Sequence, residues 1–149
     1  TVDAQRPRLW FIATLVGLLA ALNSILVSQF DTYDYVEEHV LTAMLAFGGG
    51  VFWSLLSTVA LGSKATVAGH RLRNVGFAMA AIGFVVMLAA FQPVANNFDA
   101  TGMSTTEFLN EAQEGVVVAA PAEYVLVAGL LLCLSSFRHE LRSANGPEN

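Results

Sequence analysis

Apolar residues in this chain fall into four long blocks separated by polar segments. The blocks are almost free of charge and cover residues 9–29, 40–61, 75–92 and 116–137. A bilayer core about 30 Å thick needs roughly 20 helical residues, so each block is long enough to cross it, the third only just. Runs such as Ile82–Ala90 do not alternate between apolar and polar residues, which argues against membrane β-strands. The pattern predicts an all-α, polytopic membrane protein, a bundle of four transmembrane helices in one domain over residues 1–149.

Composition agrees with this class and excludes others. Hydrophobic residues make up 55% of the chain and charged residues only 13%, whereas a soluble domain carries about 25% charge. Intrinsic disorder requires low hydrophobicity, so it is excluded. The net charge of -5 argues against a nucleic-acid partner, because proteins that bind nucleic acid carry a basic surface. The single cysteine, Cys133, excludes an internal disulfide and every multi-cysteine metal motif.

The basic residues predict the orientation in the membrane. All 7 Lys and Arg residues lie before the first block, between the second and third, or after the fourth. With four spans these segments share one side, which the positive-inside rule makes cytoplasmic. We therefore expect a multi-pass protein of the cell membrane with both termini, including the tail 138–149, inside. Four arginines are expected to anchor helix ends in the anionic inner leaflet, namely Arg71, Arg73, Arg138 and Arg142.

The excess of Arg over Lys, with abundant Ala, Gly and Val, suggests a prokaryotic source. The first extracellular segment is acidic and carries Asp31, Asp34, Glu37 and Glu38. The last three could form the first turn of the second helix, where negative charge is favoured. Their spacing matches no EF-hand loop. We expect a solvated acidic surface and no metal site, with a weak cation site as the alternative.

The second extracellular segment, residues 93–115, contains a helix start signal. Its sequence Ser104-Thr105-Thr106-Glu107 has the spacing of a capping box. We expect a short extracellular surface helix over residues 105–114, closed by Gly115. Phe108 should face the bilayer or the bundle. Three acidic side chains should face water, namely Glu107, Glu111 and Glu114.

Two polar residues lie inside the apolar blocks. Glu123 is the only acid or base within them, and Asn23 lies at a similar depth from the outer surface. Intramembrane polar groups are costly, so we hypothesise that these two side chains hydrogen-bond to one another. In the alternative, the fourth helix begins at Pro121, a favoured first helical position. Glu123 would then lie at the interface beside Tyr124.

The second block contains a stripe of small residues. Ala46 and Gly50, and then Gly50 and Ser54, are separated by three residues, a spacing that lets helix backbones approach closely. We interpret the stripe as packing within the bundle, with an interface to another subunit as the alternative. The residues assigned to this packing are Gly48, Gly49, Gly50 and Ser54.

The remaining polar residues do not form a recognisable reaction centre. Of the histidines, only His70 and His139 are predicted on one side, both in arginine-bearing flanks, and no catalytic triad is evident. We expect no cofactor and no enzymatic activity. The best interpretation is an accessory or assembly subunit of a larger membrane complex, in contact with lipid and with other membrane subunits or further copies. The alternative is an oligomeric cation channel or transporter with an acidic extracellular mouth.

Overall fold

The computed structural model describes residues 3–32, 34–101 and 104–144, and its regular elements in this part of the chain are all helical. Four long helices are α1 (Pro7–Val27), α2 (Val36–Leu61), α3 (Val67–Thr101) and α5 (Gln113–Ala144). A 3₁₀ turn, η1 (Gly62–Lys64), connects α2 to α3, and a short helix, α4 (Thr105–Glu111), lies between α3 and α5. Each long helix contains a stretch that is long and apolar enough to cross a membrane. The predicted all-α, four-span fold is confirmed.

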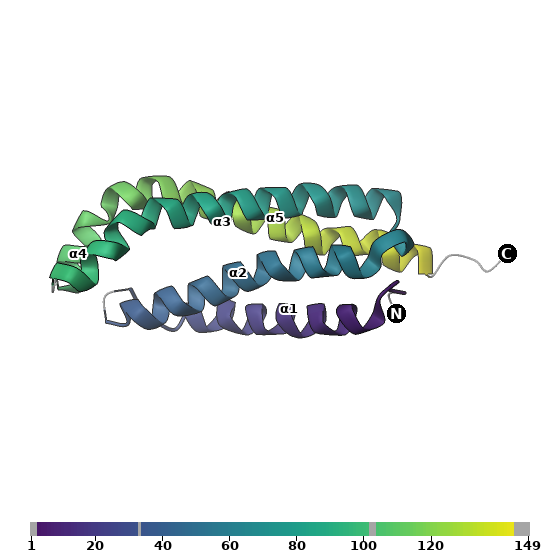
Figure 1. The fold of residues 1–149 in the computed structure, drawn as a ribbon, viewed down its shortest axis with the longest axis horizontal. Coiled ribbons are helices and arrows are strands. Elements are labelled where there is room, and N and C mark those ends of the chain that lie inside the picture. Colours follow the sequence, from purple (N-terminus) through teal and green to yellow (C-terminus); the bar gives the residue numbers. More distant parts are fainter. Residues whose placement is uncertain (1–2, 33, 102–103, 145–149) are drawn as a thin grey trace.

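The four long helices form two antiparallel hairpins (Figure 1). Helix α1 packs on α2 and α3 packs on α5, while α2 also contacts both helices of the second hairpin. The start of α1, the connection between α2 and α3, and the end of α5 lie together at one end of the bundle. We call this the basic end, because the segments that carry the Lys and Arg residues meet there. The opposite end, with α4 and the connection between α1 and α2, is called the acidic end.

The helices extend beyond the apolar blocks. Helix α3 continues through Pro93 to Thr101, and α5 begins at Gln113 and runs to Ala144. Residues 93–101 of the second predicted extracellular segment, which lie before the expected surface helix, and residues 138–144 of the predicted tail are therefore helical. The apolar blocks correspond to the part of each helix that crosses the hydrocarbon core. Polar helical turns can continue beyond it into water, where their backbone groups are solvated. Residues 145–149 of the predicted tail lie outside the described residues.

Helices α3 and α5 pack closely through a regular repeat of buried positions. Buried residues follow one another at alternating steps of three and four, the repeat of a left-handed coiled coil. A Cβ atom on Gly76 would lie 2.6 Å from the carbonyl oxygen of Gly129, and one on Gly129 would lie 2.5 Å from the amide nitrogen of Ala80. The two backbones are therefore in contact without intervening side chains. The buried positions are Gly69, Arg73, Gly76, Ala80, Gly83 and Met87 on α3, and Gly115, Ala119, Ala122, Leu126, Gly129, Cys133, Ser136 and Glu140 on α5.

The glycine triplet of α2 faces the other three long helices. A Cβ atom on Gly48 would contact Phe84 of α3, one on Gly49 would contact Ala20 of α1, and one on Gly50 would contact Leu130 of α5. The fully buried Ser54 donates its hydroxyl hydrogen to the Val51 carbonyl oxygen. These small residues thus pack against helices of the same bundle and make α2 its central helix.

The capping box at the start of α4 forms as its sequence predicts. The Ser104 hydroxyl accepts the Glu107 amide N–H at 3.4 Å, and the Glu107 carboxylate accepts the Ser104 amide N–H at 2.9 Å. Phe108 is buried, and Glu107, Glu111 and Glu114 are exposed. The expected end of this helix is wrong, however, because α4 stops at Glu111 and α5 begins at Gln113. Gly115 is buried against Ala90 of α3 instead of closing a helix.

Candidate functional site

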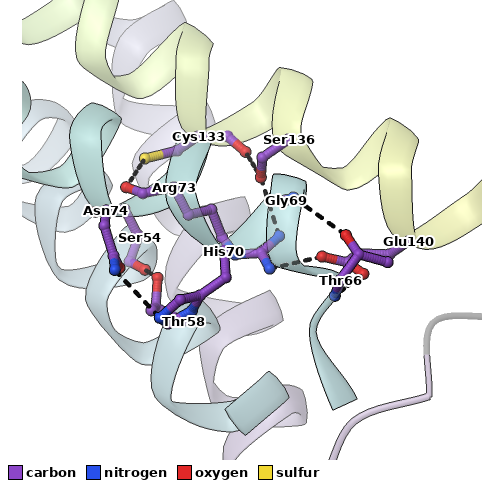
Figure 2. Close-up of polar contacts among 10 residues, drawn as sticks. All are labelled: Ser54, Thr58, Thr66, Gly69, His70, Arg73, Asn74, Cys133, Ser136 and Glu140. Carbon is purple, nitrogen blue, oxygen red and sulfur yellow. Dashed lines mark hydrogen bonds and ion pairs between the residues drawn. The ribbon is translucent and has the colours of Figure 1, made fainter. Parts of the chain in front are cut away.

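A buried ion pair joins α3 to α5 near the basic end (Figure 2). The Nη2 atom of Arg73 lies 2.7 Å from Oε1 of Glu140, and the two side chains are 0% and 5% exposed. The Nη1 atom of Arg73 donates to the Ser136 hydroxyl at 3.0 Å, and its guanidinium carbon lies 5.0 Å from the Phe137 ring centroid. The expectation that Arg73 anchors in the lipid headgroups is wrong, because its charge is turned inward and neutralised by Glu140.

The second oxygen of Glu140 organises the start of α3. Its Oε2 atom accepts the amide N–H of Thr66 at 2.9 Å, and the Thr66 hydroxyl accepts the amide N–H of Gly69 at 3.1 Å. In a capping box, the glutamate three positions into the helix supplies the first of these bonds. Here that position is Gly69, and Glu140 of α5 supplies the carboxylate. A Cβ atom on Gly69 would collide with this carboxylate and with the Thr66 hydroxyl, so a larger residue there would displace groups of this hydrogen-bond network.

Further polar contacts surround the ion pair. The Cys133 thiol lies 3.5 Å from the carbonyl oxygen of Arg73, and the Ser136 hydroxyl donates to the Cys133 carbonyl oxygen at 2.6 Å. Two buried atoms, Nε of Arg73 and Oγ of Ser57, have no hydrogen-bond partner among the described residues. We call Arg73, Glu140, Thr66 and Ser136 the Arg73–Glu140 lock. Both carboxylate oxygens of Glu140 accept hydrogen bonds, so the Arg73–Glu140 lock joins the start of α3 to the end of α5.

At the basic end, the segment before α1 contacts the end of α2 and the connection between α2 and α3. The amide N–H of Arg6 donates to the Ala60 carbonyl oxygen at 3.0 Å, and the amide N–H of Ser63 donates to the Gln5 side-chain oxygen at 3.0 Å. Lys64 forms an ion pair with Asp3. Gly62, with a φ of 53°, turns the chain out of α2 in a backbone conformation that favours glycine. The N-terminal segment therefore fixes the turn that leads into α3.

The structure does not bring Asn23 and Glu123 together. The Asn23 amide donates to the Leu19 carbonyl oxygen of its own helix at 2.8 Å, on a groove of about 500 Å³ between α1 and α2. Glu123 is exposed on α5, which is not paired with α1. The alternative helix start is also wrong, because Pro121 lies inside α5. Glu123 lies about 15 Å along the axis from the first residue of α5.

The acidic cluster lies at the acidic end of the bundle. The Asp31 carboxylate accepts the amide N–H of Asp34 at 3.0 Å and so forms part of the turn before α2. Glu37 and Glu38 are exposed in the first turn of α2, whereas Asp34 precedes the helix. Within the described ranges, no group of three or more His, Cys, Asp or Glu residues is placed to hold a metal ion.

The residues of the Arg73–Glu140 lock were not predicted as a site, although the sequence carries a signal for them. Both charged residues lie just outside the apolar blocks and resemble ordinary helix-end charges. They nevertheless continue the alternating repeat of small residues. Arg73 lies between Gly69 and Gly76, and Glu140 follows Ser136. Extending this repeat beyond the apolar blocks places both on the α3–α5 contact face.

The four long apolar helices define a polytopic α-helical membrane protein with four spans. The chain belongs to the family of Frag1/DRAM/Sfk1/Cwh43P N-terminal domains, whose model matches residues 2–144. This is a family of membrane proteins, in agreement with the fold. No curated protein and no solved structure matches the chain. The family match gives no support to the prokaryotic source suggested by the composition.

Proposed function

We propose that this chain is a non-catalytic subunit that associates side by side with other membrane proteins, as an accessory or assembly subunit of a larger complex. The observation that carries the proposal is the position of Glu123. Its side chain is exposed on α5, within a helix stretch suited to cross the membrane. Among the described residues it has no hydrogen-bond or ion-pair partner.

An isolated charge inside a bilayer is unfavourable, by about 2.5–3.5 kcal/mol at the centre of a helix on insertion scales. A polar or basic group from a neighbouring membrane protein would remove much of this cost. The exposed apolar side chains of Val116 and Val127, seven residues before and four residues after Glu123 and so on the same helix face, would then form the surrounding contact. This face of α5 is therefore the proposed subunit interface. In this proposal the protein lies in the cell membrane with its basic end in the cytoplasm, as the distribution of Lys and Arg favours.

The packing of the bundle argues against a pore through one copy. The middle of the α2, α3 and α5 contact is formed by small and apolar residues such as Gly50, Ala80 and Leu126. The buried ion pair lies at the basic end, so among the described residues it does not extend a polar lining through the middle of the bundle. The channel alternative thus requires a pore between copies of the chain, with Glu123 and the acidic end as its lining.

Purification under native conditions followed by mass spectrometry tests the proposal. We expect the wild-type chain to retain a different membrane protein in fixed stoichiometry, and the variant Glu123→Gln to lose it. The matched control Glu111→Gln removes an exposed acid of α4 and should retain the partner. A pure homo-oligomer that conducts cations supports the channel alternative. A wild-type chain purified as a monomer contradicts both.

A further inference from the structure

A pocket of about 470 Å³ lies at the basic end, beside η1 and the first turn of α3. It is separate from the Glu123 face, so a ligand bound in it would be independent of the proposed function. The pocket is lined by Gly62, Ser63, Ala65, Val67, His70 and Arg71.

The pocket carries a positive charge without a counter-charge. The described acids at this end are Asp3 and Glu140, and each is already paired, Asp3 with Lys64 and Glu140 with Arg73. Arg71 is exposed and has no carboxylate partner among the described residues. Its guanidinium therefore remains available to an anion that enters the pocket.

Neutral hydrogen-bond donors surround this charge. The His70 Nε2 atom lies 3.2 Å from the Asn74 side-chain nitrogen, which can only donate. This contact assigns the ring hydrogen of a neutral His70 to Nδ1, which leaves a second donor for a ligand. The Ser63 hydroxyl adds another.

At the start of α3 the N–H groups of Thr66 and Gly69 are already bound, to Glu140 and to the Thr66 hydroxyl. The N–H groups of Val67 and Ala68 remain for a ligand, and the helix dipole favours an anion there. Val67, the first residue of α3, is part of the pocket wall.

We propose that this pocket binds a phosphate group, presented either by an anionic lipid headgroup or as free phosphate. Arg71 supplies the charge, and His70, Ser63 and the start of α3 supply hydrogen bonds, an arrangement that suits phosphate oxygens. The basic end lies where membrane-spanning helices leave the bilayer, which is the level of lipid headgroups. The apolar wall formed by Gly62, Ala65 and Val67 fits the glycerol portion of a lipid. The Arg73–Glu140 lock holds Thr66 and thereby fixes the shape of the pocket.

The test uses the full chain in dodecyl maltoside, a detergent without phosphate. Dihexanoyl phosphatidylglycerol and sodium phosphate are titrated separately at constant ionic strength, and thermal unfolding is followed by the fluorescence of Trp10 and Trp53. A ligand that binds only the folded chain raises the unfolding temperature in a saturable way. We expect Arg71→Gln to weaken the apparent affinity about tenfold.

Arg142→Gln is the matched control, since it removes an exposed charge in the last turn of α5 that does not line the pocket. We expect it to change the affinity less than about twofold. Without ligand, Arg71→Gln should unfold at the wild-type temperature, because Arg71 pairs with no described residue. Stabilisation by the lipid alone assigns the headgroup as ligand, and equal stabilisation by sodium phosphate assigns the free anion. If neither ligand stabilises the chain, or both variants weaken binding equally, the proposal is overturned.

Discussion

At the scale of single residues, the buried pair of Arg73 and Glu140 joins α3 to α5 at the basic end. Removing one member of such a pair leaves the other charge buried without compensation, whereas replacing both can be nearly neutral. Glu140 also caps the start of α3 through Thr66. The pair should therefore behave as one unit in mutagenesis.

Glu140→Gln is expected to lower the free energy of unfolding by about 3–5 kcal/mol, because the Arg73 charge loses its partner. The double variant Arg73→Met with Glu140→Gln should be more stable than Glu140→Gln alone. It contains no uncompensated charge, and the glutamine oxygen can still accept the Thr66 amide N–H. Unfolding in mixed micelles measures both, with Glu111→Gln as an exposed control. Losses that simply add would show that the two residues are not coupled.

Glu107 gives a residue-scale prediction on pH. Hydrogen bonds from the Ser104 backbone and side chain lower the pKa of Glu107 below its ordinary value. The capping box thus contributes fully to the stability of α4 at pH values above the ordinary glutamate pKa. This contribution is lost as the pH falls through the lowered pKa. In the Ser104→Ala variant the pKa of Glu107 should rise part of the way toward its ordinary value, because the hydroxyl donor is lost while the backbone N–H still donates; a carboxyl titration by NMR measures this change. An unchanged pKa in that variant would contradict the capping role.

At the scale of helices, the contact between α3 and α5 depends on glycine at positions where the backbones touch. Gly129→Ala places a methyl group 2.5 Å from the backbone of Ala80 and Gly76. We expect it to destabilise the chain by about 1–3 kcal/mol, the usual cost of overpacking. Gly48→Ala is the matched control, because its methyl group meets only the end of the Phe84 side chain, at 3.1 Å. Equal effects of the two variants on unfolding would refute close packing of α3 and α5.

The sequence predicts the number of spans, their approximate bounds and the start of α4, because long apolar runs and capping residues are local signals. It does not predict how far α3 and α5 extend, since polar helical turns outside the bilayer leave no apolar signature. It also does not show which helices are neighbours. For that reason the predicted contact between Asn23 and Glu123 is wrong, and the contact between Arg73 and Glu140 was not predicted. The alternating repeat around Gly76 and Gly129 is the signal that would have placed both charges on one interface.

At the scale of the whole molecule, α2 of the first hairpin contacts both helices of the second hairpin, and the polar chemistry is separated between the two ends (Figure 1). The basic end contains the Arg73–Glu140 lock and the proposed phosphate pocket. The acidic end contains α4 and the carboxylates before α2. Such a charge distribution is expected of a four-span chain inserted in one orientation, and the orientation proposed above places the basic end in the cytoplasm.

Labelling of Lys64, the single lysine of the chain, tests this account most directly. A membrane-impermeant amine reagent is applied to intact cells and to opened membranes, and the modified peptide is identified by mass spectrometry. The account predicts that Lys64 is labelled only after the membrane is opened. A lysine introduced by Glu111→Lys at the acidic end should be labelled in intact cells. Labelling of Lys64 from outside intact cells would contradict the proposed orientation.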